Sequence, residues 1–167
     1  MNRRNSIATG LAVLTAVAGV NNAAQAAEET KPENPELEKL RELLKAHDDA
    51  FTGQNLEGVL ALFTPKAVIL GTGPGEIWSG HEEIKDAYTH FFGDFDKGHQ
   101  HFTYYARFGE LTSEAGWLLA SGEVKAKKEG KEFAFPLNIS VTAAKTGGQW
   151  KFAALHFSTL SSAREAK

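Results

Sequence analysis

The chain has 167 residues, which is enough for one packed domain but hardly for two. Its 18 basic and 21 acidic residues give a formal charge of −3, so we exclude an extended basic surface of the kind that binds nucleic acid. Cysteine is absent, so disulfides are excluded and burial must stabilise the fold; apolar residues, at 42%, are numerous enough for that.

The first 26 residues have the layout of a secretory signal peptide. Arg3 and Arg4 precede an uncharged run over 7–20, and Ala24-Gln25-Ala26 follows as a small-residue cleavage site. The uncharged run holds about 14 residues, fewer than the ~20 that a membrane-spanning helix needs. We therefore predict removal of residues 1–26 and export to the periplasm or the medium. The paired arginines leave the general and the twin-arginine export routes both open.

Two helices are predicted after a polar, flexible linker over 27–35. Pro35 suits the first turn of a helix that Asn34 can cap, and this helix should run to about residue 52. Its apolar face carries, at helical spacing, Leu37, Leu40, Leu44, His47 and Phe51. A second short helix should follow the possible cap Asn55, and its buried side carries Leu56, Val59, Leu60 and Phe63.

A short strand, a third helix and four long strands complete the predicted elements. The β-rich run 67–70 is a strand, and Ser79-x-x-Glu82 has the spacing of a capping box for a helix over 80–92. Strand-like segments then cover 99–110, 115–128, 131–145 and 149–160, separated by short turn signals. Such a series predicts an antiparallel meander, and residues 163–167 form a polar tail.

The glycines of ILGTGPGEIWSG, over 69–80, suggest either a phosphate-binding loop or a turn. A phosphate loop must lead directly into a helix, whose free N–H groups hold the anion. Here Glu76, Ile77 and Trp78 come before the helix, and no Lys-Ser/Thr pair follows the glycines. We therefore interpret Gly71, Gly73 and Gly75 as part of a turn between two short strands.

The order and spacing of these elements resemble a known family. The A-V-I-L strand, the W-S-G strand, the G-H-E-E-I helix and the closing segments Gly148-Gln149-Trp150-Lys151 and His156-Phe157-Ser158 are similar to the SnoaL-like branch of the nuclear transport factor 2-like superfamily, over about residues 36–162. The resemblance implies an α+β fold: a curled, mixed but mostly antiparallel sheet wrapped around three N-terminal helices, with a cone-shaped pocket. The superfamily includes enzymes, ligand binders and assembly modules, so function needs separate evidence.

The ketosteroid isomerases of this superfamily use an aspartate base and a tyrosine–aspartic acid oxyanion hole. Laid on this chain, the tyrosine falls on His47, the base on Gly71 and the second aspartate on Ser140. Because neither carboxylate is present, we do not expect ketosteroid isomerase activity.

His47 is the titratable residue that both helical spacing and the resemblance place at the pocket. It is a candidate general acid or base, or a donor to a ligand; equally, it is a core histidine satisfied by a backbone carbonyl. Asp48 follows it, but successive helical residues point about 100° apart, so we expect no direct bond between them. At best, Asp48 borders the pocket.

Two further patterns concern metals and partners. His99 and His101 face one side of a predicted strand, but without a third ligand they indicate a solvated strand end, so we predict no metal and no cofactor. In the strand over 133–141, small polar residues at 138 and 140 would face the pocket. The apolar set would then face outward and form a homodimer interface through Phe133, Phe135, Leu137, Ile139 and Val141.

Together these patterns predict an exported protein that binds a small, largely apolar molecule. The predicted pocket residues are His47, Phe51, Gly71, Trp78, Tyr88, Phe91, Asn138, Ser140 and Phe157. The alternatives are a small-molecule lyase, isomerase or hydrolase with His47 as proton carrier, and a non-catalytic oligomerisation module.

Overall fold

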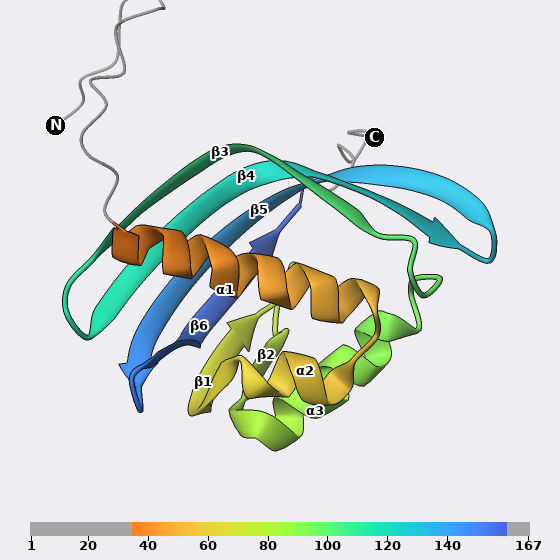
Figure 1. Cartoon of the computed structure of the whole chain (residues 1–167). Helices are drawn as coiled ribbons and strands as arrows, with labels where there is room; N and C mark the ends of the chain where they lie inside the picture. Colours follow the sequence, from red (N-terminus) through yellow and green to blue (C-terminus); the bar gives the residue numbers. More distant parts are fainter. Residues whose placement is uncertain (1–34, 160–167) are drawn as a thin grey trace, which may run out of the picture. The chain divides into compact units, whose positions relative to one another are not determined.

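A computed structural model describes residues 35–159, which form three helices and six strands (Figure 1). In chain order these are α1 Pro35–Thr52, α2 Leu56–Ala61, β1 Phe63–Leu70, β2 Ile77–Ser79, α3 Gly80–Phe92, β3 His101–Leu111, β4 Ala115–Lys128, β5 Lys131–Thr146 and β6 Gln149–Ser158. None of the three helices is long and apolar enough to cross a membrane. The predicted signal peptide, linker and polar tail (1–26, 27–35 and 163–167) lie outside the described residues, apart from Pro35.

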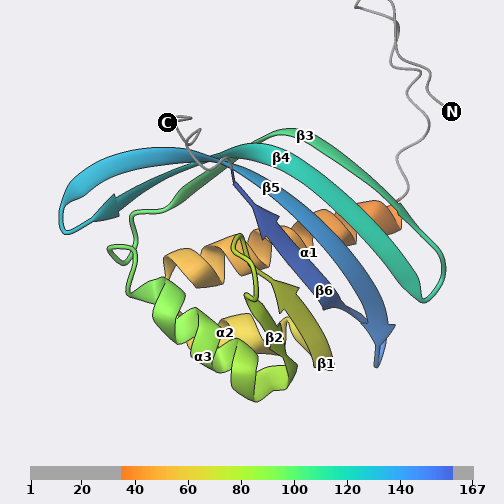
Figure 2. The ribbon, with the colours of Figure 1, turned by 180° about the vertical axis from the view of Figure 1, so that it is seen from behind.

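The six strands form one curled sheet in the order β2-β1-β6-β5-β4-β3. β1 runs parallel to β6, and every other neighbouring pair is antiparallel. The helices lie on the concave side of this sheet, as the two opposite views show (Figure 1, Figure 2). The predicted α+β architecture, with a mixed and mostly antiparallel sheet around three helices, is confirmed.

The hairpin of β4 and β5 is closed by a two-residue turn. Glu129 and Gly130 have φ angles of 52° and 76°, and two positive values are what a tight type I′ turn requires. The Asp96 carboxylate, in the loop after α3, accepts the backbone N–H groups of both residues at 2.9 and 2.7 Å. This contact ties the end of the long hairpin to the loop that carries Phe95, a residue of the cavity described below.

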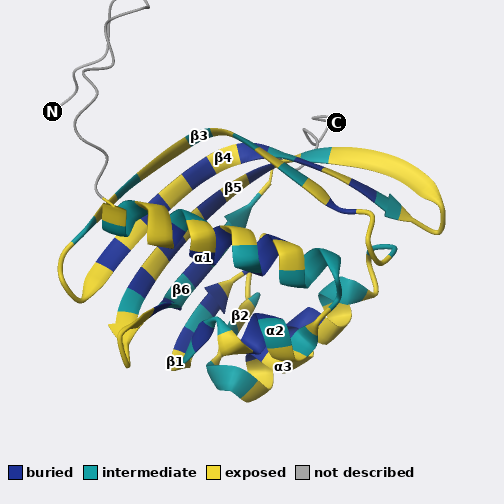
Figure 3. Cartoon of the chain, viewed as in Figure 1, coloured by how far each residue is buried: buried dark blue, intermediate teal, exposed yellow. Residues whose placement is uncertain are grey.

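Side chains alternate between core and solvent along β4 and β5, which appear as bands in Figure 3. On β5, Ile139 is 1% exposed and faces the helices, whereas Ser140 faces solvent. The prediction that the apolar set of β5 faces outward is therefore wrong, and Leu137, Ile139 and Val141 belong to the core. Because side chains alternate with a period of two, an error of one residue in placing Ser140 reverses the whole strand.

The outer face of the sheet nevertheless carries exposed apolar side chains, on β3 and β4. Phe108 is 67% exposed and pairs with Leu119, which is 45% exposed; Trp117, two residues before Leu119, shares its side of β4 and is 42% exposed. Tyr105 on β3 is 70% exposed. The sequence analysis did not select these residues, because their apolar character does not by itself say which face is covered.

Candidate functional site

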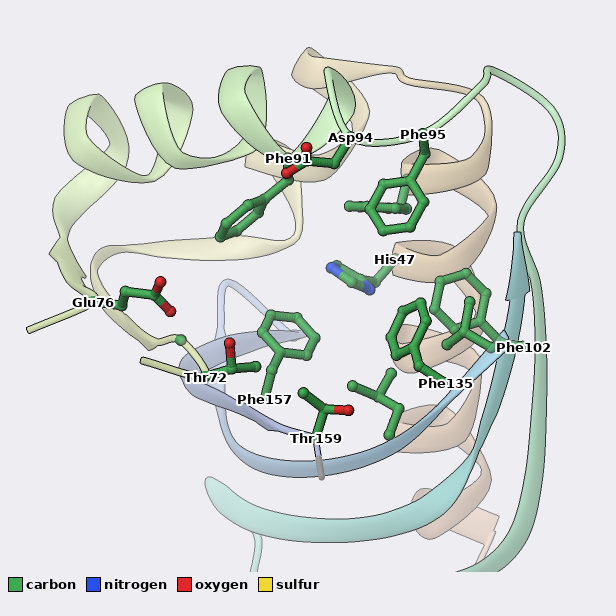
Figure 4. Close-up of a pocket in the computed structure, with 14 residues that line it drawn as sticks. His47, Thr72, Glu76, Phe91, Asp94, Phe95, Phe102, Phe135, Phe157 and Thr159 are labelled. Carbon is green, nitrogen blue, oxygen red and sulfur yellow. The ribbon is translucent and has the colours of Figure 1, made fainter. Parts of the chain in front are cut away.

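A cavity of about 320 Å³ lies between the helices and the concave face of the sheet (Figure 4). Its volume lies at the lower end of the range for ligand pockets. Among the described residues, six phenylalanines line it: Phe51, Phe91, Phe95, Phe102, Phe135 and Phe157. The other lining residues are His47, Gly71, Thr72, Glu76, Asp94, Val124, Leu137 and Thr159. The wall is thus mainly aromatic, with a few polar groups.

The structure brings together only some of the predicted pocket residues. Those that line the cavity are His47, Phe51, Gly71, Phe91 and Phe157. Tyr88 is fully buried, and Trp78 packs edge-to-face on Phe91 with ring centroids 5.3 Å apart; neither belongs to the lining. Asn138 and Ser140 are exposed on the opposite face of the sheet, so their assignment to the pocket is wrong.

His47 belongs to a buried chain of hydrogen bonds that joins α1, α3 and β3. Its Nε2 lies 2.6 Å from the hydroxyl of Tyr88, and its Nδ1 lies 3.2 Å from Asp48 Oδ1. Tyr104 donates its hydroxyl to the other Asp48 oxygen, Oδ2, at 2.9 Å. The expectation of no direct bond between His47 and Asp48 is wrong, because the 100° between successive helical positions describes the Cβ directions, and the side-chain torsions close the remaining gap.

The protonation of this chain follows from its burial. Burial raises the pKa of Tyr88 well above its ordinary value, and the negative charge of Asp48 raises it further. Burial also raises the pKa of Tyr104, again with Asp48 contributing. Both tyrosines therefore keep their hydroxyl protons. The Asp48 carboxylate can only accept, so Nδ1 is the donor in that contact, and Nε2 of the neutral imidazole then accepts the Tyr88 hydroxyl. Both ring nitrogens of His47 are thus hydrogen-bonded to protein groups, and the imidazole has no free nitrogen for a ligand.

The Gly71–Glu76 segment forms the turn between β1 and β2, as predicted. Gly71 donates its N–H to the backbone oxygen of Glu76 at 2.8 Å, and Gly75 has a φ of +83°. A Cβ on Gly71 would lie 2.8 Å from the Cβ of Glu76 and closer still to its Oε2. The missing side chain at Gly71 therefore makes room for the carboxyl group of Glu76.

Glu76 is a cavity residue that the sequence analysis missed. Gly73 donates its N–H to Glu76 Oε2 at 2.7 Å, whereas Oε1 has no hydrogen-bond or ion-pair partner within residues 35–159. A carboxylate thus lies beside Gly71, where the resemblance places the base of the isomerases. A sequence signal was present: Glu76 is the one acidic residue in a turn whose glycines leave space for a side chain.

The second acidic group of the lining, Asp94, follows the last turn of α3. Lys128 Nζ lies 2.6 Å from Asp94 Oδ1, so this carboxylate already has a cationic partner. The described lining contains no lysine or arginine. Glu76 is therefore the acidic group of the cavity whose charge no basic side chain balances.

The two histidines predicted to begin a strand lie in different elements. β3 begins at His101, which is exposed, and His99 precedes it in the loop. In the part of the chain that the structure describes, no group of three or more histidine, cysteine, aspartate or glutamate side chains is close enough to hold a metal ion.

Several solved structures share this fold. A ketosteroid isomerase-like protein from Erwinia carotovora atroseptica is 21% identical, with a TM-score of 0.61 over 77% of this chain and 99% of that chain. A nuclear transport factor 2-like protein of unknown function from Pseudomonas putida is 14% identical, with a TM-score of 0.65 over 78% and 90%. A protein from Streptomyces avermitilis, provisionally named a dehydratase of the same superfamily, is 14% identical, with a TM-score of 0.66 over 75% and 97%.

At these identities the similarity shows the fold alone. No curated protein matches the sequence. The SnoaL-like domain, however, matches residues 40–162, which span all of the sheet, α2, α3 and most of α1. With this match over most of its length, the chain belongs to the SnoaL-like domain family.

Proposed function

We propose that the protein binds a small, largely apolar molecule in the cavity and that His47 is a structural part of its wall. The observation that carries this proposal is a cavity of about 320 Å³ with six phenylalanines in its lining, next to a histidine whose two nitrogens are both hydrogen-bonded to protein. Burial of apolar surface supplies affinity in such a site. A proton carrier must reach its substrate directly or through a bonded partner, and neither Tyr88 nor Asp48 belongs to the cavity lining.

Calorimetric titration with a two-ring aromatic hydrocarbon tests the proposal. The wild type should bind it, and ligand at 100 times its dissociation constant should add about 2.7 kcal/mol to the free energy of unfolding. Leu137→Phe places a larger side chain in the cavity and should weaken binding at least tenfold. Ser140→Phe, three residues along the strand on the opposite face, is the matched control and should bind like wild type. Equal affinity in both variants would place the ligand outside this cavity.

Catalysis is the second candidate, and Glu76 favours it. Its Oε1 has no partner in residues 35–159, so it can accept a proton from a ligand, which makes Glu76 a better proton carrier than His47 for a lyase, isomerase or hydrolase reaction. The similar protein from Streptomyces avermitilis is provisionally named a dehydratase, a kind of lyase. Mass spectrometry of a bound ligand after incubation separates the two functions. A binder returns the ligand unchanged, whereas an enzyme converts it and loses turnover in Glu76→Gln.

We also propose a homodimer through the outer face of β3 and β4, where Phe108, Trp117 and Leu119 are exposed. Leu119→Glu should give a folded monomer by light scattering, because the charge would be buried without a partner in an apolar interface. A wild type that is already monomeric would refute this proposal. A module that only oligomerises is less well supported, because its own side chains would fill the cavity.

Export is proposed from the first 26 residues. The mature chain should begin at Ala27, and the product should be found in the periplasm or the medium. Mass spectrometry of the protein from its native host checks this expectation: a soluble chain that retains Met1 would contradict it.

A further inference from the structure

The polar groups of the cavity are unevenly suited to different ligands. Its described lining has two acidic side chains, Glu76 and Asp94, and no lysine or arginine. Lys128 already balances Asp94 at 2.6 Å. An anionic ligand would therefore meet uncompensated negative charge from Glu76 and no basic group. A cationic ligand would find a counter-charge.

Hydrogen-bond donors for an anionic ligand are also scarce. His47 has its Nε2 and Nδ1 engaged with Tyr88 and Asp48, so it has no N–H to offer to a carboxylate or an oxyanion. The Thr159 hydroxyl already donates to the backbone oxygen of Pro136 at 2.7 Å, so the Thr72 hydroxyl is the remaining neutral side-chain donor in the described lining. A ligand that needed several strong donors would lose more by leaving water than it would gain here.

Glu76, by contrast, is positioned to accept a hydrogen bond from a ligand. The Gly73 N–H fixes Oε2 at 2.7 Å, and the absence of side chains at Gly71 and Gly73 lets the carboxyl group lie against the turn. The second oxygen, Oε1, has no protein partner in the described part of the chain. In Figure 4, Glu76 lies at one side of the cavity and Phe102 and Phe135 lie at the other. The site thus has an acidic side and an aromatic side.

The phenylalanine rings suit the apolar body of such a ligand, and a ring face that meets its positive group attracts that group as well. The face of an aromatic ring attracts an organic cation within about 6 Å of its centroid, and the attraction increases when water is excluded. Six phenylalanines contribute to the described lining. Aromatic walls combined with one carboxylate are a suitable environment for an alkylammonium group attached to an apolar body.

We propose that the ligand is a small apolar amine in its protonated form, whose ammonium group donates to Glu76 Oε1 while its apolar body lies among the phenylalanines. This inference rests on the proposed ligand-binding function and narrows its ligand class. It excludes fatty acids and other carboxylates as preferred ligands.

Four probes with one two-ring skeleton test the ligand class: 2-methylnaphthalene, 2-naphthalenemethanol, 2-naphthylmethylamine and 2-naphthoic acid. Titration calorimetry on the wild-type protein at pH 7 should give the tightest binding for the amine, at least tenfold tighter than for the alcohol. The acid should bind more weakly than the hydrocarbon. This comparison needs no variant, so it does not depend on how a substitution affects folding.

The source of the preference is tested with Glu76→Gln, which keeps a carbonyl oxygen for the Gly73 N–H. The ratio of its affinity for the amine to its affinity for the hydrocarbon should fall about tenfold, equivalent to about 1.4 kcal/mol. Glu57→Gln, an equal loss of charge at an exposed position on α2, is the matched control and should change neither.

The possible outcomes distinguish a failure of the amine preference from a failure of the proposed ligand binding. If all four probes bind with similar affinity, or the acid binds best, the amine preference is refuted while ligand binding in the cavity stands. If no probe binds at concentrations up to its solubility in water, the proposed function fails and the amine preference fails with it. If the amine binds best but Glu76→Gln binds it as tightly as wild type, the recognition of the ammonium group by Glu76 is refuted.

Discussion

His47→Leu, alone and combined with Tyr88→Phe, tests whether His47 is a structural residue. Leucine is close to histidine in size but makes no hydrogen bonds. The change leaves the hydroxyl of Tyr88, a residue that is 0% exposed, without its acceptor, and it leaves Asp48 Oδ1 without its donor. We therefore expect a large loss of stability on replacing His47. A residue with a purely catalytic role would not be needed for stability.

The magnitude follows from those two orphaned groups. A buried hydroxyl without a partner costs about 1–3 kcal/mol, and a lost hydrogen bond to a charged group costs about 1.5–3 kcal/mol. His47→Leu should thus lower the free energy of unfolding by about 2.5–6 kcal/mol, a large part of the ~5–15 kcal/mol of a typical domain. Tyr88→Phe orphans only Nε2 of His47 and should cost about 1–3 kcal/mol. In the double variant both partners of this hydrogen bond are absent. Its loss of unfolding free energy should therefore be about 1–3 kcal/mol smaller than the sum of the two single losses.

Urea unfolding followed by circular dichroism measures all three values, with an unchanged m-value as the sign of comparable unfolded states. Asp49→Asn is the control: Asp49 is exposed and beside Asp48, and the change should stay within about 0.5 kcal/mol. Strictly additive costs for His47→Leu and Tyr88→Phe would refute the bond between the two residues. A His47→Leu protein as stable as wild type would refute its structural role.

Three further predictions follow from the described geometry. Gly71→Ala should displace the Glu76 side chain and break its bond to Gly73, so the amine probe should bind about tenfold more weakly; wild-type affinity would show that Glu76 does not need this space. Ile139→Asp should unfold the protein by circular dichroism, because an unpaired buried charge costs about 3–5 kcal/mol beyond the lost apolar contacts, whereas Ser140→Asp should remain folded. Hydrogen bonds from Lys39, followed by Trp150 and Lys145, hold the pKa of Glu36 at about 2 against an ordinary 4.5. Because the folded-state pKa is depressed, this contribution is present above pH 4.5 and disappears as the pH falls through about 2, so Glu36→Gln should flatten the acid limb of stability against pH; an unchanged limb would contradict the shift.

Local sequence patterns were sufficient for the order of the elements but not for every boundary: Phe63, predicted to lie on the second helix, begins β1. The 3.6-residue spacing that includes Leu40, Leu44 and His47 identified the buried face of α1, and Glu129-Gly130 marked the hairpin turn between β4 and β5. These features depend on neighbours within a few positions, so they can be read along the chain. The short turns between the long strands predicted the antiparallel meander, and the fold class came from the resemblance of the element order to the SnoaL-like family.

The cavity was decided by contacts between distant segments. Which side of β5 is buried depends on where the helices pack, and alternation alone is the same for both choices. The bond between Tyr104 and Asp48 joins residues 56 positions apart, and that between His47 and Tyr88 joins residues 41 apart. No periodicity reports such pairs. Only the curled sheet brings α1, α3 and β3 together, and so gives His47 its partners.

Glu76 also separates what the local sequence predicts from what packing decides, here within one turn. Its turn was predicted from the glycines, but the direction of its side chain was not, because that depends on the space left above Gly71 and on the Gly73 N–H. The sequence alone determined the order of the strands and helices and three of the six phenylalanines in the wall, Phe51, Phe91 and Phe157. Tertiary packing decided which polar groups face the cavity, because burial and hydrogen bonding are properties of the assembled surfaces and not of local sequence.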